Sequence, residues 1–294
     1  MVPLRPSTSF AICLAASGAA IACSCADDDA LGVVAFLDET GTSVHLVSVA
    51  TGETRTLDQG RSFGNLSVSP DRQRLAYGSP RTTGALSDVF VIETAGGEPR
   101  PISPRGHGFR WGRTGWMLYA DATSRTVLVP AGGPEGRVLG TLFGVEIAES
   151  PVDDLIAYVD CVEADQSCIR SELIVERPDG SDRRVVVDDF LGGRVEFTPD
   201  GQRLLVFEAG TPWKAVVRSL DGTLLADLGP TASQTGLGGR IAGGSRFSPD
   251  GSQLLLRRDA ELLVVDLDGT GEELVGTNAQ SAAFTASGRI VYTT

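Results

Sequence analysis

Short apolar runs alternate with turn residues along most of the chain. From residue 31 onward the apolar runs are only a few residues long, and Gly, Pro, Asp and Asn separate them. Runs of this kind are typical of β-strands, whereas a helix needs a longer stretch with apolar positions every three to four residues. No long stretch of that helical kind follows residue 30. The pattern therefore predicts an all-β protein.

One apolar-to-turn transition is especially clear, at residues 247–251 (Phe-Ser-Pro-Asp-Gly). Pro249 presets φ for a turn, Asp250 can accept hydrogen bonds from nearby amides, and Gly251 can adopt a conformation that other residues avoid. The apolar run 254–256 follows directly. The segment predicts the corner of a β-hairpin.

The same corner recurs along the chain. Its copies are anchored at Pro70, Arg113, Pro151, Pro199, Pro249 and Ala286, and the gaps between the anchors are 43, 38, 48, 50 and 37 residues. A second set of turns lies between the expected third and fourth strands, at residues 50–52, 95–97, 178–180, 220–222 and 267–269. A period of about 40–45 residues with four short strands is typical of propeller blades. Six corners predict a six-bladed β-propeller.

The two ends of the chain are expected to complete one blade together. The strands that begin at residue 33 match the second, third and fourth strands of a blade, and residues 282–285 would supply its first strand. A propeller closed in this way leaves no open edge between its first and last blades. Residues 289–294 compete with residues 33–37 for the second-strand position, and the sequence leaves that choice open.

The N-terminus is predicted to be a lipoprotein signal peptide. Arg5 precedes an apolar run at residues 10–22, which is too short to span a bilayer. Residues 20–23 (Ala-Ile-Ala-Cys) resemble the lipobox of bacterial lipoproteins, in which the cysteine is lipidated and becomes the first residue. Cys23 is therefore the expected lipidation site. Cys25 is a second candidate, and the alternative is an ordinary cleaved signal in which Cys23 is incidental.

This interpretation divides the chain into three parts. Residues 1–22 are the signal peptide, residues 23–30 are the anchor with a short acidic linker, and residues 31–294 are the propeller. Ser24 and Ala26 offer no inner-membrane retention aspartate, so the lipoprotein resemblance implies the periplasmic side of the outer membrane. The formal net charge of −13 argues against a nucleic-acid surface, because phosphate binding needs clustered Lys and Arg. We expect a monomer.

Two of the five cysteines fall in the body of the predicted propeller. Cys161 and Cys168 flank an expected loop between two strands, and an oxidising compartment favours a disulfide between them. A zinc site would need two further ligands, and the two histidines, His45 and His107, lie in distant repeats. We therefore expect a disulfide, no metal and no cofactor.

No catalytic motif is present. The sequence lacks a Gly-x-Ser-x-Gly elbow, a His-Glu-x-x-His pair and a Gly-rich phosphate loop. His45 alternates with apolar residues and is expected to be structural. His107 precedes an innermost strand, so it is a candidate for the mouth of the central channel, with packing or surface exposure as the alternative. The repeated Pro-Asp aspartates are expected to cap their turns, since chemistry needs one site rather than several copies.

One position on the innermost strand varies in charge between repeats. The residues three before the anchors are Ser67, Arg110, Ala148, Glu196, Arg246 and Ala283. Glu196 and Arg246 lie in adjacent repeats, and an inter-blade ion pair is the favoured interpretation, because charges near a core persist mainly when paired. The alternative is a binding site at the channel mouth formed by His107, Arg110, Glu196 and Arg246.

The repeat resembles the TolB-type, WD-like β-propeller repeat. The resemblance rests on the corner at residues 247–251, the strand at 254–256 and the segment at 262–269 (Leu-Leu-Val-Val-Asp-Leu-Asp-Gly). It covers the chain from residue 31 onward and includes no counterpart of the N-terminal α/β domain of periplasmic members of that family. It implies the fold, whereas the repeats and the absence of a catalytic set lead us to expect a non-enzymatic envelope lipoprotein that binds a protein or another envelope component through one propeller face. The alternatives are a lactonase-, lyase- or peptidase-like enzyme, or a propeller that binds a sugar or another small ligand at its channel.

Overall fold

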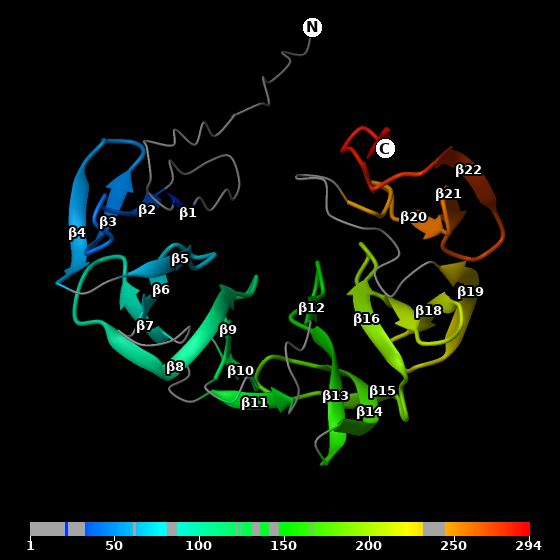
Figure 1. The fold of residues 1–294 in the computed structure, drawn as a ribbon, viewed down its shortest axis with the longest axis horizontal. Helices are drawn as coiled ribbons and strands as arrows, with labels where there is room; N and C mark the ends of the chain where they lie inside the picture. The colour runs from blue at the N-terminus through cyan, green and yellow to red at the C-terminus, as the bar shows by residue number, and fades with distance from the viewer. Residues whose placement is uncertain are drawn as a thin grey trace, which may run out of the picture. The chain divides into compact units, whose positions relative to one another are not determined.

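A computed structural model of the full chain describes residues 21–22, 33–60, 63–80, 87–121, 123, 125–130, 136–140, 147–165, 167–231 and 245–294. These residues form β-strands and turns, as predicted, and they contain no helix, hence none that could span a membrane (Figure 1). The chain divides into two compact units, Met1–Val138 (unit 1) and Leu139–Thr294 (unit 2). Each unit is a series of antiparallel sheets.

Unit 1 begins with a four-stranded sheet. Its strands are β1 (Ile21–Ala22), β2 (Val33–Leu37), β3 (Ser43–Ser48) and β4 (Thr54–Gln59), in that order across the sheet. Burial alternates along β2 and β3, so that one face carries buried apolar residues. This face packs against the start of the next sheet, in a cluster that includes Phe63, Val68 and Tyr77.

The second sheet of unit 1 has seven strands. They are β5 (Gly64–Val68), β6 (Arg74–Pro80), β7 (Ser87–Glu93), β8 (Arg100–Trp111), β9 (Met117–Ala120), β10 (Thr126–Val129) and β11 (Arg137–Gly140), the last of which runs across the boundary between the units. The sequence predicted two separate strands at residues 99–103 and 108–111. Instead, β8 is one strand of 12 residues that pairs with β7 at its start and with β9 at its end. Two four-stranded blades therefore share one strand.

Unit 2 continues the repeat with two regular four-stranded sheets. The first contains β12 (Ala148–Glu149), β13 (Ile156–Asp165), β14 (Ser167–Glu176) and β15 (Arg184–Val187). The second contains β16 (Gly192–Phe197), β17 (Arg203–Glu208), β18 (Trp213–Ser219) and β19 (Leu224–Thr231). Neighbouring strands in both sheets are antiparallel, so each sheet is a four-stranded meander (Figure 1).

The end of unit 2 is less regular. A three-stranded sheet contains β20 (Gln253–Arg258), β21 (Glu261–Asp266) and β22 (Glu272–Thr277). Single bridges at Ser245 and Phe247 stand where the sequence predicted a first strand at residues 244–247. The chain ends in a hairpin of β23 (Ser281–Phe284) and β24 (Ile290–Thr293).

The terminal strands answer the question that the sequence left open. Residues 290–293 pair with residues 281–284. β24 therefore takes the second-strand position, beside β23, which is the first strand of the last repeat. On the other side, β2 pairs with β1 and β3, and the expected pairing of residues 282–285 with residues 33–37 is not found among the described strands. The hairpin turn between β23 and β24 is short, which favours local pairing. Ring closure by both termini stays a prediction, as does the count of six blades.

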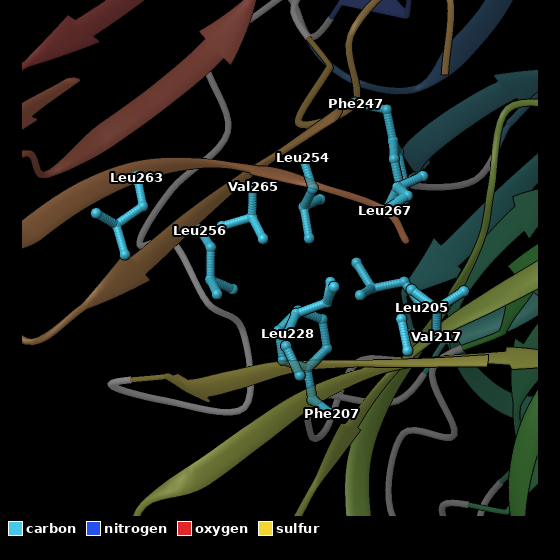
Figure 2. Packing of buried hydrophobic residues seen from close by; sticks show 12 residues of the cluster. Leu205, Phe207, Val217, Leu228, Phe247, Leu254, Leu256, Leu263, Val265 and Leu267 are labelled. Atoms are coloured by element: carbon cyan, nitrogen blue, oxygen red, sulfur yellow. The ribbon is translucent and has the colours of Figure 1, made fainter. Parts of the chain in front are cut away.

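The core of unit 2 lies between its sheets. Figure 2 shows buried side chains of β17, β18 and β19 facing those of β20 and β21, with Leu205, Phe207 and Leu228 opposite Leu254, Leu256 and Val265. Most of these side chains are completely buried. Full burial of one such side chain contributes about 1.5–3 kcal/mol, so the contact between sheets is a main source of stability.

The repeated corners share one hydrogen-bonding scheme. In each of three corners a buried hydroxyl donates to the aspartate two residues later and accepts the backbone N–H five residues later; these pairs of hydroxyl and aspartate are Ser69–Asp71, Thr198–Asp200 and Ser248–Asp250. Each aspartate also accepts the N–H of the residue two positions on. The capping role predicted for the aspartates is confirmed.

Candidate functional site

Glu196 and Arg246 occupy equivalent positions in neighbouring repeats of unit 2. Glu196 lies on β16 opposite Leu205 of β17. Arg246 lies between the two bridged residues that precede β20, and its carbonyl accepts the N–H of Leu255. Both residues therefore face the second strand of their own sheet at the same register, as the repeat alignment predicted.

The two side chains form the predicted ion pair, with Arg246 Nε 3.3 Å from Glu196 Oε2. A third residue, Arg194, joins them, with its Nε 2.9 Å from Glu196 Oε1. The exposed fractions of the Arg194, Glu196 and Arg246 side chains are 15, 18 and 11%. The Arg246 guanidinium also lies over the ring of Phe207, 5.6 Å from its centre. We call Arg194, Glu196 and Arg246 the charged cluster.

Arg194 was not among the residues predicted from the sequence. The predicted pair came from one position in each repeat, and Arg194 lies two residues before Glu196 on the same strand. Side chains two apart on a strand point to the same face, so a search along the strand would have found it. The carboxylate of Glu196 therefore bridges two guanidinium groups.

The composition of the charged cluster suits the recognition of anions. It combines two cations with one anion, so it carries a net positive charge in a chain whose formal net charge is −13. Partly buried guanidinium groups bind carboxylates and phosphates with defined geometry.

The other two candidate residues, His107 and Arg110, belong to unit 1. Both lie on β8, His107 opposite Ala120 and Arg110 opposite Leu118. The Arg110 side chain is exposed, and its guanidinium lies 5.5 Å from the centre of the Trp116 ring. The side chain of His107 lies outside the described residues. A common site for these residues and the charged cluster stays a prediction.

The remaining chemical candidates have structural surroundings or lie outside the described residues. The His45 ring stacks on Phe36, and its Nδ1 is 3.2 Å from the hydroxyl of Thr56, which fits the structural role expected of it. Among the described residues, no three His, Cys, Asp or Glu side chains are grouped as metal ligands. The predicted lipidation site, Cys23, falls outside the described part of the chain.

Cys161 is disulfide-bonded. It lies on β13, and the backbone of Cys168 lies on the neighbouring strand β14, opposite Ala164. The side chain of Cys168 lies outside the described residues, so the pairing of these two cysteines stays a prediction. A disulfide at Cys161 agrees with the oxidising compartment that the sequence implies.

The corner aspartates ionise easily because their turns supply hydrogen bonds. The hydroxyl of Ser248 and the N–H of Ser252 lower the pKa of Asp250 to about 2. At Asp71, burial opposes ionisation, but the Ser69 hydroxyl, the backbone N–H of Gln73 and the charge of Arg74 together lower the pKa below its usual value. These carboxylates hold turns together.

Comparison with known proteins relates the chain to others by fold. The chain matches the crystal structure of a eukaryotic initiation factor at 15% identity and a TM-score of 0.57, over 88% of this chain and 67% of that one. It matches dipeptidyl peptidase 4 of Porphyromonas gingivalis at 10% identity and a TM-score of 0.57, over 88% of this chain and 51% of that one. TolB of Acinetobacter baumannii matches at 13% identity and a TM-score of 0.42, over 84% of this chain and 64% of that one.

These similarities concern the fold alone. With the repeated four-stranded antiparallel sheets, they show an all-β, propeller-like fold. The chain spans about two thirds of the length of the initiation factor and about half that of the peptidase. No protein-family model and no curated protein sequence matches the chain.

Proposed function

We propose that this protein is a non-enzymatic module of the bacterial cell envelope that binds another envelope protein through the surface around the charged cluster. The observation that carries the proposal is the bridging of Glu196 by Arg194, on the same strand β16, and by Arg246, in the bridged segment before β20. A partly buried cluster with net positive charge is complementary to a partner surface that is acidic or carries carboxylates. Electrostatic complementarity of this kind supplies specificity and speeds association.

The proposal includes the anchor and the closed fold. The signal-like residues 1–22 and the lipobox-like residues 20–23 support lipidation at Cys23, and the disulfide at Cys161 supports an oxidising compartment. We place the protein on the periplasmic side of the outer membrane, as a monomer that binds no nucleic acid. The six repeated corners support six blades, with one blade completed by both chain ends.

An enzyme is the alternative that the experiment must address. A propeller enzyme would bring carboxylates, histidines or a metal from several blades to the channel axis. Among the described residues of unit 2, the charged side chains at the repeated inner-strand position instead contact one another. The proposal of a binding module rests on this difference.

The test is affinity capture from a detergent-solubilised envelope with the full-length protein as bait. A triple variant, Arg194→Glu with Glu196→Arg and Arg246→Glu, inverts every charge of the cluster and keeps both contacts complementary. Its matched control exchanges the Arg218–Glu208 pair, whose guanidinium and carboxylate are 2.6 Å apart in the same unit. The control should fold equally well and leave the cluster unchanged.

We expect one reproducible protein partner with the wild type and with the Arg218–Glu208 exchange. The inverted cluster should lose this partner while the protein stays folded, with only a small fall in melting temperature because Arg246 no longer lies over the ring of Phe207. Equal capture by all three proteins would place the binding surface elsewhere. Turnover of an envelope substrate by the purified protein would contradict the non-enzymatic assignment.

A further inference from the structure

One arginine of unit 2, Arg257, has a guanidinium without a partner. It makes neither a hydrogen bond nor an ion pair with any residue that the structure describes. Arg257 lies on β20 opposite Leu262 of β21, and the hydroxyl of Thr231 donates to its backbone carbonyl at 3.0 Å, which fixes the backbone at this point. The next residue, Arg258, differs, because it contacts both carboxylate oxygens of Glu272, at 2.9 and 2.8 Å.

The Arg257 side chain is half-buried, and its Nε is enclosed without a hydrogen-bond partner. Its neighbours on the same face of the sheet, Leu255 and Leu262, are completely buried in the apolar cluster that joins the sheet to the hairpin at the chain end. Buried polar groups in native proteins are nearly always hydrogen-bonded, so an exception calls for an explanation such as a bound group. The two Nη atoms are not enclosed, so an anion can reach them.

The preceding repeat shows how the same position can be covered. Phe207 stands at the position of Arg257 in that repeat, and the guanidinium of Arg246 lies 5.6 Å from the centre of its ring. In the last repeat the residue equivalent to Arg246 is Ala283, which has only a methyl group and is itself buried. The position that covers Phe207 therefore offers no cover to Arg257.

Arg257 adjoins the charged cluster. The N–H of Leu255 donates to the carbonyl of Arg246 at 2.8 Å, so these two residues lie opposite each other, and Arg257 is two residues further along the strand. Diagonal positions of this kind on one face of an antiparallel pair are about 7–8 Å apart. Arg246 contacts Glu196, whereas no carboxylate in the described part of the chain neutralises Arg257. The surface around the charged cluster thus includes one further cation.

We propose that the protein partner bound at this surface places an Asp or Glu carboxylate on the Nη atoms of Arg257. This inference rests on the proposed function and names one of its contacts. Charge complementarity supports it, because a fixed guanidinium without a counter-ion adjoins a cluster of net positive charge in a chain whose formal net charge is −13. A half-buried guanidinium binds a carboxylate more strongly than a fully solvated one, since water screens the contact less.

The test is an NMR titration of the full-length protein with two short peptides at constant ionic strength. The probe is N-acetyl-Gly-Glu-Gly amide, and its partner is the same peptide with Gln in place of Glu. Because the Nε of Arg257 is enclosed, its N–H should exchange slowly with water and give a separate signal, identified by its absence in Arg257→Gln. The control is Arg184→Gln, since Arg184 also lacks a partner among the described residues but is exposed on an outer strand.

We expect the Glu peptide to shift this signal with a Kd of about 1–10 mM, at least about tenfold below that of the Gln peptide, the difference expected from one hydrogen bond between charged groups. Read on the backbone N–H of Leu262, the preference should vanish in Arg257→Gln and persist in Arg184→Gln. An equal response to both peptides, a preference that persists in Arg257→Gln, or the lack of a slowly exchanging Nε–H signal would each overturn the proposal.

Failure of the proposed function gives a different result. In the affinity capture, Arg257→Gln should recover less of the partner than the wild type does. Full recovery by Arg257→Gln, with loss of the partner in the inverted cluster, would overturn this inference and leave the proposed function intact. Capture of no partner by the wild type would overturn the proposed function, and this inference with it.

Discussion

Equivalent positions of the repeat have different surroundings in the two units. In unit 2, the turn between β18 and β19 lies directly on the preceding sheet, and a Cβ added at Gly222 would be 2.0 Å from the carbonyl oxygen of Val186. In unit 1, the corresponding turn between β7 and β8 has open space at Gly96. There the preceding sheet reaches the turn through a long side chain, since Arg55 donates to the carbonyl of Ala95 at 3.1 Å.

The charged inner-strand position shows the same difference. Glu196 in unit 2 is bridged by two arginines and is largely buried, whereas Arg110 in unit 1 is exposed beside Trp116. Both residues occupy the same register relative to the second strand of their sheets. The repeat therefore sets where a side chain lies along a strand, and the contact with the neighbouring sheet decides what the side chain does there.

Substitution of the turn glycines should give the largest change in the free energy of unfolding. Gly222 and Gly96 have nearly the same backbone conformation, with φ of 92° and 97°. Alanine at either position incurs the cost of a left-handed conformation, about 1–2 kcal/mol. At Gly222 the new methyl group also meets the Val186 carbonyl, a backbone atom that cannot rotate away. We expect Gly222→Ala to lower the free energy of unfolding by about 3–5 kcal/mol, and Gly96→Ala by only the smaller cost.

Denaturant unfolding of both variants measures this difference. The slope of free energy against denaturant should be unchanged, so that the midpoints report stability directly. Equal losses in the two variants would mean that the sheets of unit 2 can separate at this turn without cost.

Removal of the inner-strand charges should lower the free energy of unfolding by an intermediate amount. Glu196→Ala leaves Arg194 and Arg246 close together and largely buried without their shared carboxylate. We expect a loss of about 2 kcal/mol, below the cost of breaking a fully buried pair because the residue retains some contact with water. Arg110→Ala removes an exposed cation–π contact and should cost about 0.5 kcal/mol.

A double-mutant cycle separates these contributions. The combination of Glu196→Ala with Arg246→Ala should destabilise less than the sum of the single variants, because the second change removes a charge that the first left uncompensated. Additive effects on the free energy of unfolding would show that Glu196 and Arg246 do not interact energetically in solution.

Much of the fold could be predicted because local chemistry repeats. The corners at Pro199 and Pro249 combine a turn proline, a capping aspartate and a glycine at positive φ, and each is followed by an apolar strand. β8 was predicted wrongly because Pro104, Gly106 and Gly108 suggest a turn. The strand nevertheless passes through these residues, with a positive φ of 56° at Gly108 and a shift of register between His107 and Arg110. The chain ends could not be assigned, because the competing strands have similar apolar patterns.

The candidate site could be predicted only in part. The contact between Glu196 and Arg246 follows from their equal positions in adjacent repeats. Arg194 was missed because the comparison followed one position across the repeats and ignored its neighbour on the same face.

Substitution of the corner aspartates should give the smallest change in stability. How this change depends on pH and salt distinguishes the two units. Hydroxyl and backbone N–H groups hold the pKa of Asp250 near 2, below its ordinary value of 3.8. A carboxyl whose pKa is lower in the folded state contributes stability above its ordinary pKa and loses this contribution as the pH falls through the folded value. The wild type should therefore be more stable than Asp250→Asn at pH 7, and the difference should vanish between about pH 4 and pH 2.

Asp71 in unit 1 sharpens this prediction, because the charge of Arg74 contributes to its lowered pKa while Asp250 has only hydroxyl and N–H partners. Salt screens charges near the surface but leaves short hydrogen bonds largely intact. The stability difference between the wild type and Asp71→Asn should shrink at 1 M NaCl, and the difference for Asp250→Asn should stay the same. The measurement is the free energy of unfolding of the three proteins at pH 2–7 in low and high salt. An equal response to salt at both corners would show that the ion pair with Arg74 contributes nothing to the corner in unit 1, so that the two corners work by hydrogen bonds alone.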